Sequence, residues 1–305
     1  MRKKKDLVSL RDLDRGEVFN ILKMARKLKK RPLLCKTSCG DKTLALLFQK
    51  PSNRTRISFE VAMVHLGGYV LYLSPSEIDM GGREPVKDVG RVVSRYVDGI
   101  VARVFSHNDV QDLSVYSDVP VINGLSDMAH PCQALSDVFT VMEAKGLKKV
   151  KLAYVGDGNN VLNSLVMAAA KTGLNMSIAT PAGYEPDAEN FDEAVREARL
   201  SKAAIWKCND PFEAVRDADV VYTDVWVSMG QEQDREKRLK DFRPFQVNDR
   251  LMKAAKPDAL IMHCLPAHRG EEITDVIDGK NSIVYDQAEN RMHVQKAVLL
   301  KLMSS

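Results

Sequence analysis

Short apolar runs alternate with segments of helical periodicity along most of this chain. Residues 11–30 begin the pattern, because Val18, Ile21 and Leu22 recur at the spacing of a helix with one buried face. Strands of a few residues that alternate with helices predict parallel sheets covered on both faces. The apolar runs that we interpret as strands are residues 44–48, 69–73, 99–104, 119–122, 151–155, 175–179, 220–223, 259–262 and 283–285.

A long helical pattern divides this alternation into two halves. It runs from His130 to about Lys145, and a closing helical pattern at residues 288–303 can return to the first half. At 305 residues the chain is long enough for two ordinary domains. We therefore predict an α/β fold of two doubly wound parallel-sheet domains with a cleft between them, linked by long helices. The predicted domains are residues 1–138, joined by a C-terminal helix at 289–305, and residues 139–288.

Composition narrows the class of protein. Hydrophobic residues make up 45% of the chain and charged residues 28%, as in a soluble globular protein, and the net charge of +4 does not indicate a nucleic-acid partner. No apolar run approaches membrane-spanning length, and no signal-peptide segment follows the basic start. The five cysteines are odd in number and widely scattered, which argues against a disulfide framework and fits a reducing cytosol. We expect a cytoplasmic protein without a membrane partner.

Residues 52–56, Ser-Asn-Arg-Thr-Arg, form the most distinctive polar motif. A strand, a polar turn and a helix start place unpaired backbone N–H groups and the positive end of a helix dipole together. Ser52 and Thr55 add hydroxyl donors, and the two arginines add guanidinium groups that match phosphate oxygens. The motif favours a site for a small phosphorylated anion. A solvated helix start capped by Ser52 or Asn53 is the alternative.

Other polar residues follow predicted strands or open predicted helices. Arg103 stands at the end of a predicted strand, where α/β sheets place ligand groups. His130 and Gln133 lie three residues apart at a helix start, so both can reach one ligand. Asp224 directly follows a buried strand and can bind an ammonium group. Each residue also has a structural explanation, such as a charged strand end, a packed imidazole or a capped loop.

Metal and nucleotide sites have weaker support. His263, Cys264 and His268 lack an obvious fourth ligand, and the two cysteines at 35 and 39 lack a second pair, so we predict no metal. Residues 156–158, Gly-Asp-Gly, resemble the start of a dinucleotide fingerprint, but Val161 stands where the third glycine should be. A tight turn explains both glycines equally well. A nicotinamide-dependent dehydrogenase is therefore a rival interpretation, and it predicts saturable NAD binding.

Taken in order, these segments resemble the aspartate/ornithine carbamoyltransferase family over nearly the whole chain. Any one segment is ordinary, but the set in this order and at this separation is specific. Residues 228–230, Ser-Met-Gly, and 263–266, His-Cys-Leu-Pro, resemble the ornithine-using members rather than the aspartate-using members. The other segments that carry the resemblance are residues 52–56, 102–104 (Ala-Arg-Val), 130–133 (His-Pro-Cys-Gln), 158–160 (Gly-Asn-Asn), 224–227 (Asp-Val-Trp-Val) and 289–291 (Glu-Asn-Arg).

The resemblance implies an activity. Members of the family transfer the carbamoyl group of carbamoyl phosphate to an amine, here the side-chain amine of L-ornithine, giving citrulline and phosphate without a metal or organic cofactor. Family members share active sites between subunits, which implies a homotrimer or an assembly of trimers. The implied carbamoyl-phosphate residues are Ser52, Asn53, Arg54, Thr55, Arg103, His130, Gln133, Cys264, the Leu265 backbone and Arg291; the implied ornithine residues are Asn160, Asp224, Ser228 and Met229; and the implied catalytic residues are Arg103, His130, Asp224 and Cys264.

Two positions depart from the family pattern. Asn53 replaces the usual threonine, and its amide still offers a donor and can cap a helix. Asp79 replaces a glutamine or histidine on a loop that reaches a neighbouring subunit's phosphate site, where a carboxylate repels phosphate unless Arg83 or another cation offsets it. Asp79 is the best argument for one rival, a catalytically silent relative. The nearest rival is a sister carbamoyltransferase that uses aspartate, putrescine or an acylated ornithine.

Overall fold

The structure, a computed structural model, describes residues 4–228 and 230–304, so the implied ornithine ligand Met229 lies outside the described residues. Their contacts define two compact units. One unit holds the chain up to Ser136 and from Asn290 onward, and the other holds Asp137–Glu289. The division falls within the helices α6 (Pro131–Ala144) and α12 (Val284–Met303). Each unit contains one parallel sheet with helices packed on it, which confirms the predicted fold class.

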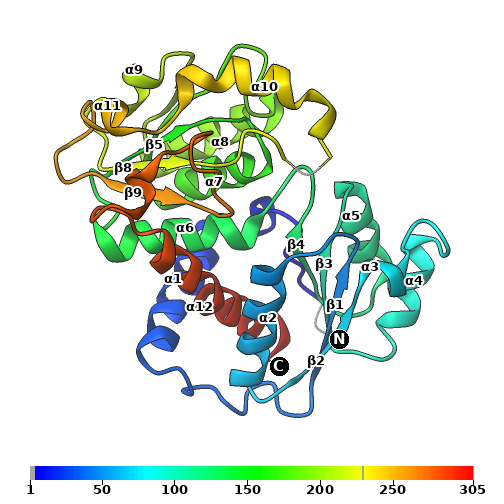
Figure 1. The fold of residues 1–305 in the computed structure, drawn as a ribbon. Coiled ribbons are helices and arrows are strands. Elements are labelled where there is room, and N and C mark those ends of the chain that lie inside the picture. The colour runs from blue at the N-terminus through cyan, green and yellow to red at the C-terminus, as the bar shows by residue number, and fades with distance from the viewer. Residues whose placement is uncertain (1–3, 229, 305) are drawn as a thin grey trace. The chain divides into compact units, whose positions relative to one another are not determined.

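The first unit is built on a four-stranded sheet in the order β2-β1-β3-β4, with every neighbouring pair parallel. The two central strands are apolar and buried, whereas the edge strand β2 is partly exposed. Helices cover both faces of the sheet (Figure 1). The strands are β1 (Thr43–Phe48), β2 (Tyr69–Leu73), β3 (Gly99–Arg103) and β4 (Val121–Leu125), and the helices besides α6 and α12 are α1 (Arg15–Lys30), α2 (Asn53–His65), α3 (Pro75–Ile78), α4 (Val86–Val93) and α5 (His107–Tyr116).

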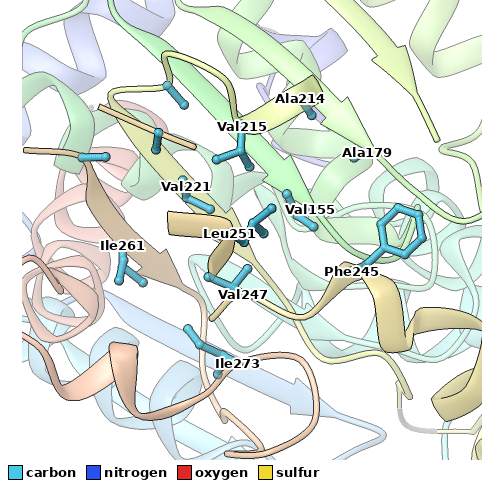
Figure 2. Packing of buried hydrophobic residues seen from close by; sticks show 14 of the residues in the cluster. Val155, Ala179, Ala214, Val215, Val221, Phe245, Val247, Leu251, Ile261 and Ile273 are labelled. Atoms are coloured by element: carbon cyan, nitrogen blue, oxygen red, sulfur yellow. The ribbon is translucent and has the colours of Figure 1, made fainter. Parts of the chain in front are cut away.

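The second unit is built on a five-stranded parallel sheet in the order β7-β6-β5-β8-β9. One face packs a cluster in which Val155, Val221 and Ile261 of the strands meet Val215 and Leu251 of covering helices (Figure 2). The strands are β5 (Lys151–Val155), β6 (Asn175–Ala179), β7 (Ile205–Cys208), β8 (Val220–Thr223) and β9 (Leu260–His263), and the helices are α7 (Asn160–Thr172), α8 (Ala188–Ser201), α9 (Pro211–Val215), α10 (Arg235–Phe242) and α11 (Asp249–Met252).

Local signals explain where the structure departs from the predicted elements. The first helix begins at Arg15 rather than at residue 11, because Asp14 and Glu17 form a reciprocal capping box across its first turn. The predicted strand at 283–285 is wrong, since α12 already begins at Val284. The strand β7 was not predicted, because it is short and only partly buried. Among the described residues, no helix is both long enough and apolar enough to cross a membrane.

Candidate functional site

The start of α2 lies at the carboxyl end of β1, the edge where parallel sheets bind ligands. The Ser52 hydroxyl caps the helix by accepting from the Thr55 N–H at 3.3 Å. No acidic residue stands in the first turn, so local side chains leave the positive end of the dipole unneutralised. Asn53 is exposed as the first helical residue, and Thr55 is fully buried. This arrangement suits an anion.

The two arginines of the motif have different surroundings. Arg56 donates from Nε to Glu60 at 2.8 Å and lies 3.8 Å from the centre of the Tyr72 ring. Its guanidinium is therefore engaged on the outer part of α2. Arg54 instead contributes positive charge near Arg103 and His130. Of the two arginines of the motif, only Arg54 thus lies near the other cations, and its role in holding phosphate stays a prediction.

Arg103 ends β3, and a register shift against β4 falls directly before it. Its side chain is buried, and among the described residues its Nε has no hydrogen-bond partner. Burial, followed by the charges of Arg291 and Arg54, lowers the pKa of Arg103 to about 10. Arg291 is held from α12 by a 2.9 Å bond from its Nη2 to the Thr55 hydroxyl. Cationic side chains thus converge on the capped start of α2.

His130 and Gln133 are buried at the start of α6. Burial, followed by the charges of Arg291, Arg103, Lys50 and Arg54, holds the pKa of His130 well below its usual value. The imidazole is therefore neutral at physiological pH, and it can serve as a hydrogen-bond donor to a carbonyl oxygen but not as a cation. We call the four positive residues around it, Lys50, Arg54, Arg103 and Arg291, the cation cluster.

Lys50 is the member of the cation cluster that sequence reasoning missed. Its side chain is buried, and its Nζ lies 4.9 Å from the centre of the Phe105 ring. Burial and then the charge of Arg103 lower the pKa of Lys50 to about 8, although Asp127 opposes this. A lysine two residues before Ser52 is ordinary in a sequence, and only its burial beside Arg103 reveals it.

Asp79 is used within its own turn. It ends α3 in the left-handed region at φ 32°, and its carboxylate accepts from the backbone N–H of Arg83 at 3.1 Å. The Arg83 guanidinium points to the carbonyl of Glu77 instead of to this carboxylate. Arg83 therefore contacts the Asp79 carboxylate through its backbone N–H and not through its guanidinium.

In the second unit, Asp224 is the centre of a hydrogen-bonded group at the carboxyl end of β8. It is 4% exposed. Its carboxylate accepts from Asn159 Nδ2 at 2.7 Å, from Cys264 Sγ at 2.8 Å and from the Val225 N–H at 2.8 Å. Asn159, which sequence reasoning also missed as a site residue, caps α7 through its Oδ1 at the same time. The loops after β5, β8 and β9 thus meet at one carboxylate.

Cys264 remains a thiol in this setting. Burial, followed by the charge of Asp224 and the hydrogen bond to it, raises its pKa well above the usual value. A thiol that donates to a carboxylate cannot also act as the base for an amine. Of the two groups expected beside the attacking nitrogen, Asp224 is therefore the one that can accept a proton, and Cys264 donates a hydrogen bond to it.

The other implied ligands in this unit lie on the same loops. Asn160 is the first residue of α7, and Ser228 follows the buried Trp226 in the loop after β8. The Leu265 N–H donates to His263 Nδ1 at 2.9 Å, in a backbone with φ 58°. These residues are brought to the carboxyl edge of the sheet, where α/β proteins bind ligands.

The glycines of residues 156–158 have a structural cause. A Cβ on Gly158 would lie 2.3 Å from the backbone of Glu185, so the close packing of two loops requires glycine there. Gly156 has φ 148°, a conformation that side chains disfavour. The turn explanation therefore accounts for the partial dinucleotide fingerprint.

Two groups of side chains among the described residues have donor atoms within 4.8 Å of one another, as in metal sites. The first joins His263 and Cys264 with Asp224 rather than with His268. Both ring nitrogens of His263 are engaged, by the Leu265 N–H and by Glu272. The second group, His268, Glu271 and Glu272, lies apart from the implied ligands, and Glu272 already accepts from His263.

Comparison with known proteins identifies the family. The profile for the carbamoyl-phosphate-binding domain of aspartate/ornithine carbamoyltransferases matches residues 5–143, and the profile for their aspartate/ornithine-binding domain matches residues 148–302. The chain therefore belongs to the aspartate/ornithine carbamoyltransferase family. It is similar to the ornithine carbamoyltransferase of Pyrococcus abyssi, with 55% identity over 99% of this chain and 96% of that one.

Solved structures agree with this assignment. The ornithine carbamoyltransferase from Pyrococcus furiosus superposes with a TM-score of 0.95 at 55% identity, over 98% of this chain and 97% of that one. The enzyme from Thermus thermophilus gives a TM-score of 0.89 at 46% identity, over 99% of both chains. The curated relative from Pyrococcus furiosus is named an anabolic ornithine carbamoyltransferase, with 55% identity over 98% of this chain and 96% of that one.

Proposed function

We propose that this chain transfers the carbamoyl group of carbamoyl phosphate to the side-chain amine of L-ornithine, giving L-citrulline and phosphate. Residues 1–138 and 289–305 take carbamoyl phosphate, and residues 139–288 take ornithine. The observation that carries the proposal is the cation cluster around the neutral His130, because the charges that shift the pKa values of His130 and Arg103 are all positive. Such a site calls for an anion.

The cation cluster suits both parts of carbamoyl phosphate. Arg54 and the start of α2, with Ser52, Asn53 and Thr55, hold the phosphate, and a preorganised cation stabilises it as a leaving group. Arg103 and neutral His130 donate to the carbonyl oxygen, which gains negative charge when the amine attacks. Gln133 binds the carbamoyl amide, and Arg291, Cys264 and the Leu265 backbone complete the site. Because carbamoyl phosphate is already activated, these residues supply positioning and charge.

On the ornithine side, an ammonium nitrogen has no lone pair and cannot attack. Asp224 first attracts the cationic side chain and then accepts the proton that the amine must lose. Cys264, held protonated, and Asn159 fix the orientation of that carboxylate. Asn160, Ser228 and Met229 bind the amino-acid end. Nitrogen then bonds to the carbamoyl carbon, the bond to phosphate breaks, and a phosphate oxygen accepts the second proton that the nitrogen loses.

A panel of amine acceptors tests this proposal. The protein is incubated with carbamoyl phosphate and, in turn, ornithine, putrescine, aspartate and an acylated ornithine, and both the carbamoylated product and phosphate are measured. We expect citrulline with ornithine and little product otherwise. Preference for another acceptor would establish a sister carbamoyltransferase instead. Absence of product with every acceptor would favour a silent relative, and saturable NAD binding would favour a dehydrogenase.

Assembly and location are part of the same proposal. We infer a homotrimer or an assembly of trimers, and apolar residues on α2 and the edge strand β2 support an interface: Ile57 is 58% exposed, Tyr69 66% and Leu71 52%. Light scattering should give a mass of at least three times 34.1 kDa, and Leu71→Lys should lower it. A monomeric wild type would contradict the inference. The five free cysteines support a cytoplasmic location. The anabolic name of the Pyrococcus furiosus relative supports a role in arginine biosynthesis.

A further inference from the structure

Arg238 of α10 is a buried cation that the mechanism above does not use. Six of the eight residues of α10 are charged, yet Arg238 alone among these six is buried, with 7% of its surface exposed. Its guanidinium lies 4.8 Å from the centre of the Tyr184 ring and 5.2 Å from that of Phe242. Two aromatic faces thus hold a charge that would otherwise be costly to bury.

The same guanidinium contacts two different loops. Nε donates to the backbone carbonyl of Trp226 at 2.5 Å, and Nη2 lies 2.6 Å from Asp157 Oδ2 in an ion pair that lacks the alignment of a hydrogen bond. Trp226 lies in the loop after β8, two residues beyond Asp224. Asp157 lies in the turn after β5, two residues before Asn159. Arg238 therefore bridges the two loops that present these side chains.

The bridge is supported by packing around it. The Trp226 ring lies 5.9 Å from the Phe242 ring, and Tyr184 lies 4.7 Å from Phe242 and donates from its hydroxyl to Asp241 at 2.9 Å. Trp226 and Phe242 are both buried. The loop after β8 is thus fixed through the backbone and the buried ring of Trp226, and α10 supplies the contacts to both.

We propose that Arg238 is a positioning residue for the amine substrate. Its contacts with Asp157 and Trp226 set the distance between the loops after β5 and β8, and hence the places of Asp224 and Ser228 relative to Asn160. This inference rests on the proposed function. It also explains the buried Asp157 carboxylate, because that side chain is the partner of Arg238 rather than part of a dinucleotide site.

The pH dependence of the ion pair offers a signature that general loss of structure would not imitate. Burial raises the pKa of Asp157 to about 6, with Arg238 and the Gly158 N–H opposing the shift and Asp224 adding to it. Three other titratable groups lie around the pair: Tyr184 in the loop after β6, Tyr154 in β5 and Asp241 in α10. Above about pH 6 the pair is charged, and below it the carboxyl is neutral.

The test measures KM for ornithine and KM for carbamoyl phosphate separately. Arg238→Met should raise KM for ornithine at least 20-fold and change KM for carbamoyl phosphate less than twofold. The exposed Lys237→Gln is the matched control on the same helix and should change neither. Arg238→Lys should recover only part of the loss, since lysine cannot contact both loops in the same way.

A variant that leaves Asp157 buried without a partner can fail to fold, so the double variant Arg238→Met/Asp157→Asn is measured beside it. It should fold and still show the raised KM for ornithine. At pH 7.5, Asp157→Asn should have a higher KM for ornithine than the wild type. At pH 5.5 the two KM values should be nearly equal, because Asp157 of the wild type is then protonated and has lost its charge. A double variant with wild-type KM for ornithine, or an equal rise in both KM values, would overturn the inference, whereas an inactive wild type would overturn the proposed function instead.

Discussion

The cation cluster of the first unit and the Asp224 group of the second unit solve opposite electrostatic problems. In the cation cluster, positive groups crowd one another, and the pKa values of Lys50 and Arg103 fall to about 8 and about 10. In the Asp224 group, the carboxylate already accepts from a thiol, an amide and a backbone N–H. In the proposed function, an anionic substrate completes the first group. The second has its carboxylate held by three hydrogen-bond donors of its own unit and therefore keeps a fixed geometry.

This difference has an energetic consequence. The shift of Arg103 from 12.5 to about 10 corresponds to about 3 kcal/mol of unfavourable burial and repulsion. In the proposed function, a bound phosphate dianion would offset the repulsion between these cations. The Asp224 carboxylate, by contrast, accepts three hydrogen bonds within its own unit. Substitutions should therefore lower activity in both groups but affect stability differently.

The largest expected effect is on turnover. Arg54→Ala should lower kcat/KM about 10²–10³-fold, because it removes a cation aimed at the leaving phosphate. The fold should remain, since Arg54 is exposed at the start of α2. The exposed Arg26→Ala serves as the control and should stay within twofold of wild type. Steady-state kinetics and thermal melting check both variants, and retention of most activity in Arg54→Ala would show that phosphate binds elsewhere.

Asp224→Asn should come next and should separate the two substrates. The amide cannot accept the proton of the amine, so kcat/KM for ornithine should fall about 10²-fold. The Kd of a phosphonate analogue of carbamoyl phosphate, measured by calorimetry, should stay within twofold. Equal damage to both substrates would contradict the division of labour between the two groups.

Lys50→Met tests the residue that only the structure revealed. We expect KM for carbamoyl phosphate to rise about 10-fold, and we expect the melting temperature not to fall, because a buried cation among other cations is removed. In the wild type this KM should rise as the pH passes about 8, where free Lys50 loses its proton, and the variant should lack that rise. An identical pH profile in both proteins would place Lys50 outside the substrate site.

The smallest expected effect is on stability. His130 is buried with its pKa well below 6.5, so below that pH the unfolded chain binds a proton that the folded chain does not. Stability is lost as the pH falls below 6.5, at up to about 1.4 kcal/mol per pH unit from this residue. Urea unfolding between pH 5 and 6.5 should show a shallower pH dependence for His130→Asn. An unchanged slope would mean that His130 is charged in the folded protein.

The sequence predicted those features that depend on local patterns. Apolar runs located eight of the nine strands found in residues 4–228 and 230–304, because buried parallel strands are short and continuously hydrophobic. The strand predicted at residues 283–285 is wrong, because an apolar run of three residues at the start of α12 is too short to show helical periodicity. The strand β7 was missed because Lys207 is exposed in its middle.

Site features that depend on tertiary burial could not be predicted in the same way. Arg238 stands in a helix of nearly continuous charge, and nothing in that pattern distinguishes the buried cation from its exposed neighbours. Likewise, Arg56 differs from Arg54 because it contacts Glu60 and Tyr72. Tyr72 belongs to β2, so this contact depends on the fold. Motif order therefore indicated which segments carry the chemistry, whereas the structure indicates which side chains of those segments are engaged elsewhere.

A crystal structure with a phosphonate analogue of carbamoyl phosphate tests the central claim most directly. The account predicts phosphonate oxygens within hydrogen-bond distance of Arg54 and the first N–H groups of α2, with the carbonyl oxygen beside Arg103 and His130. A phosphonate bound away from the cation cluster would contradict it.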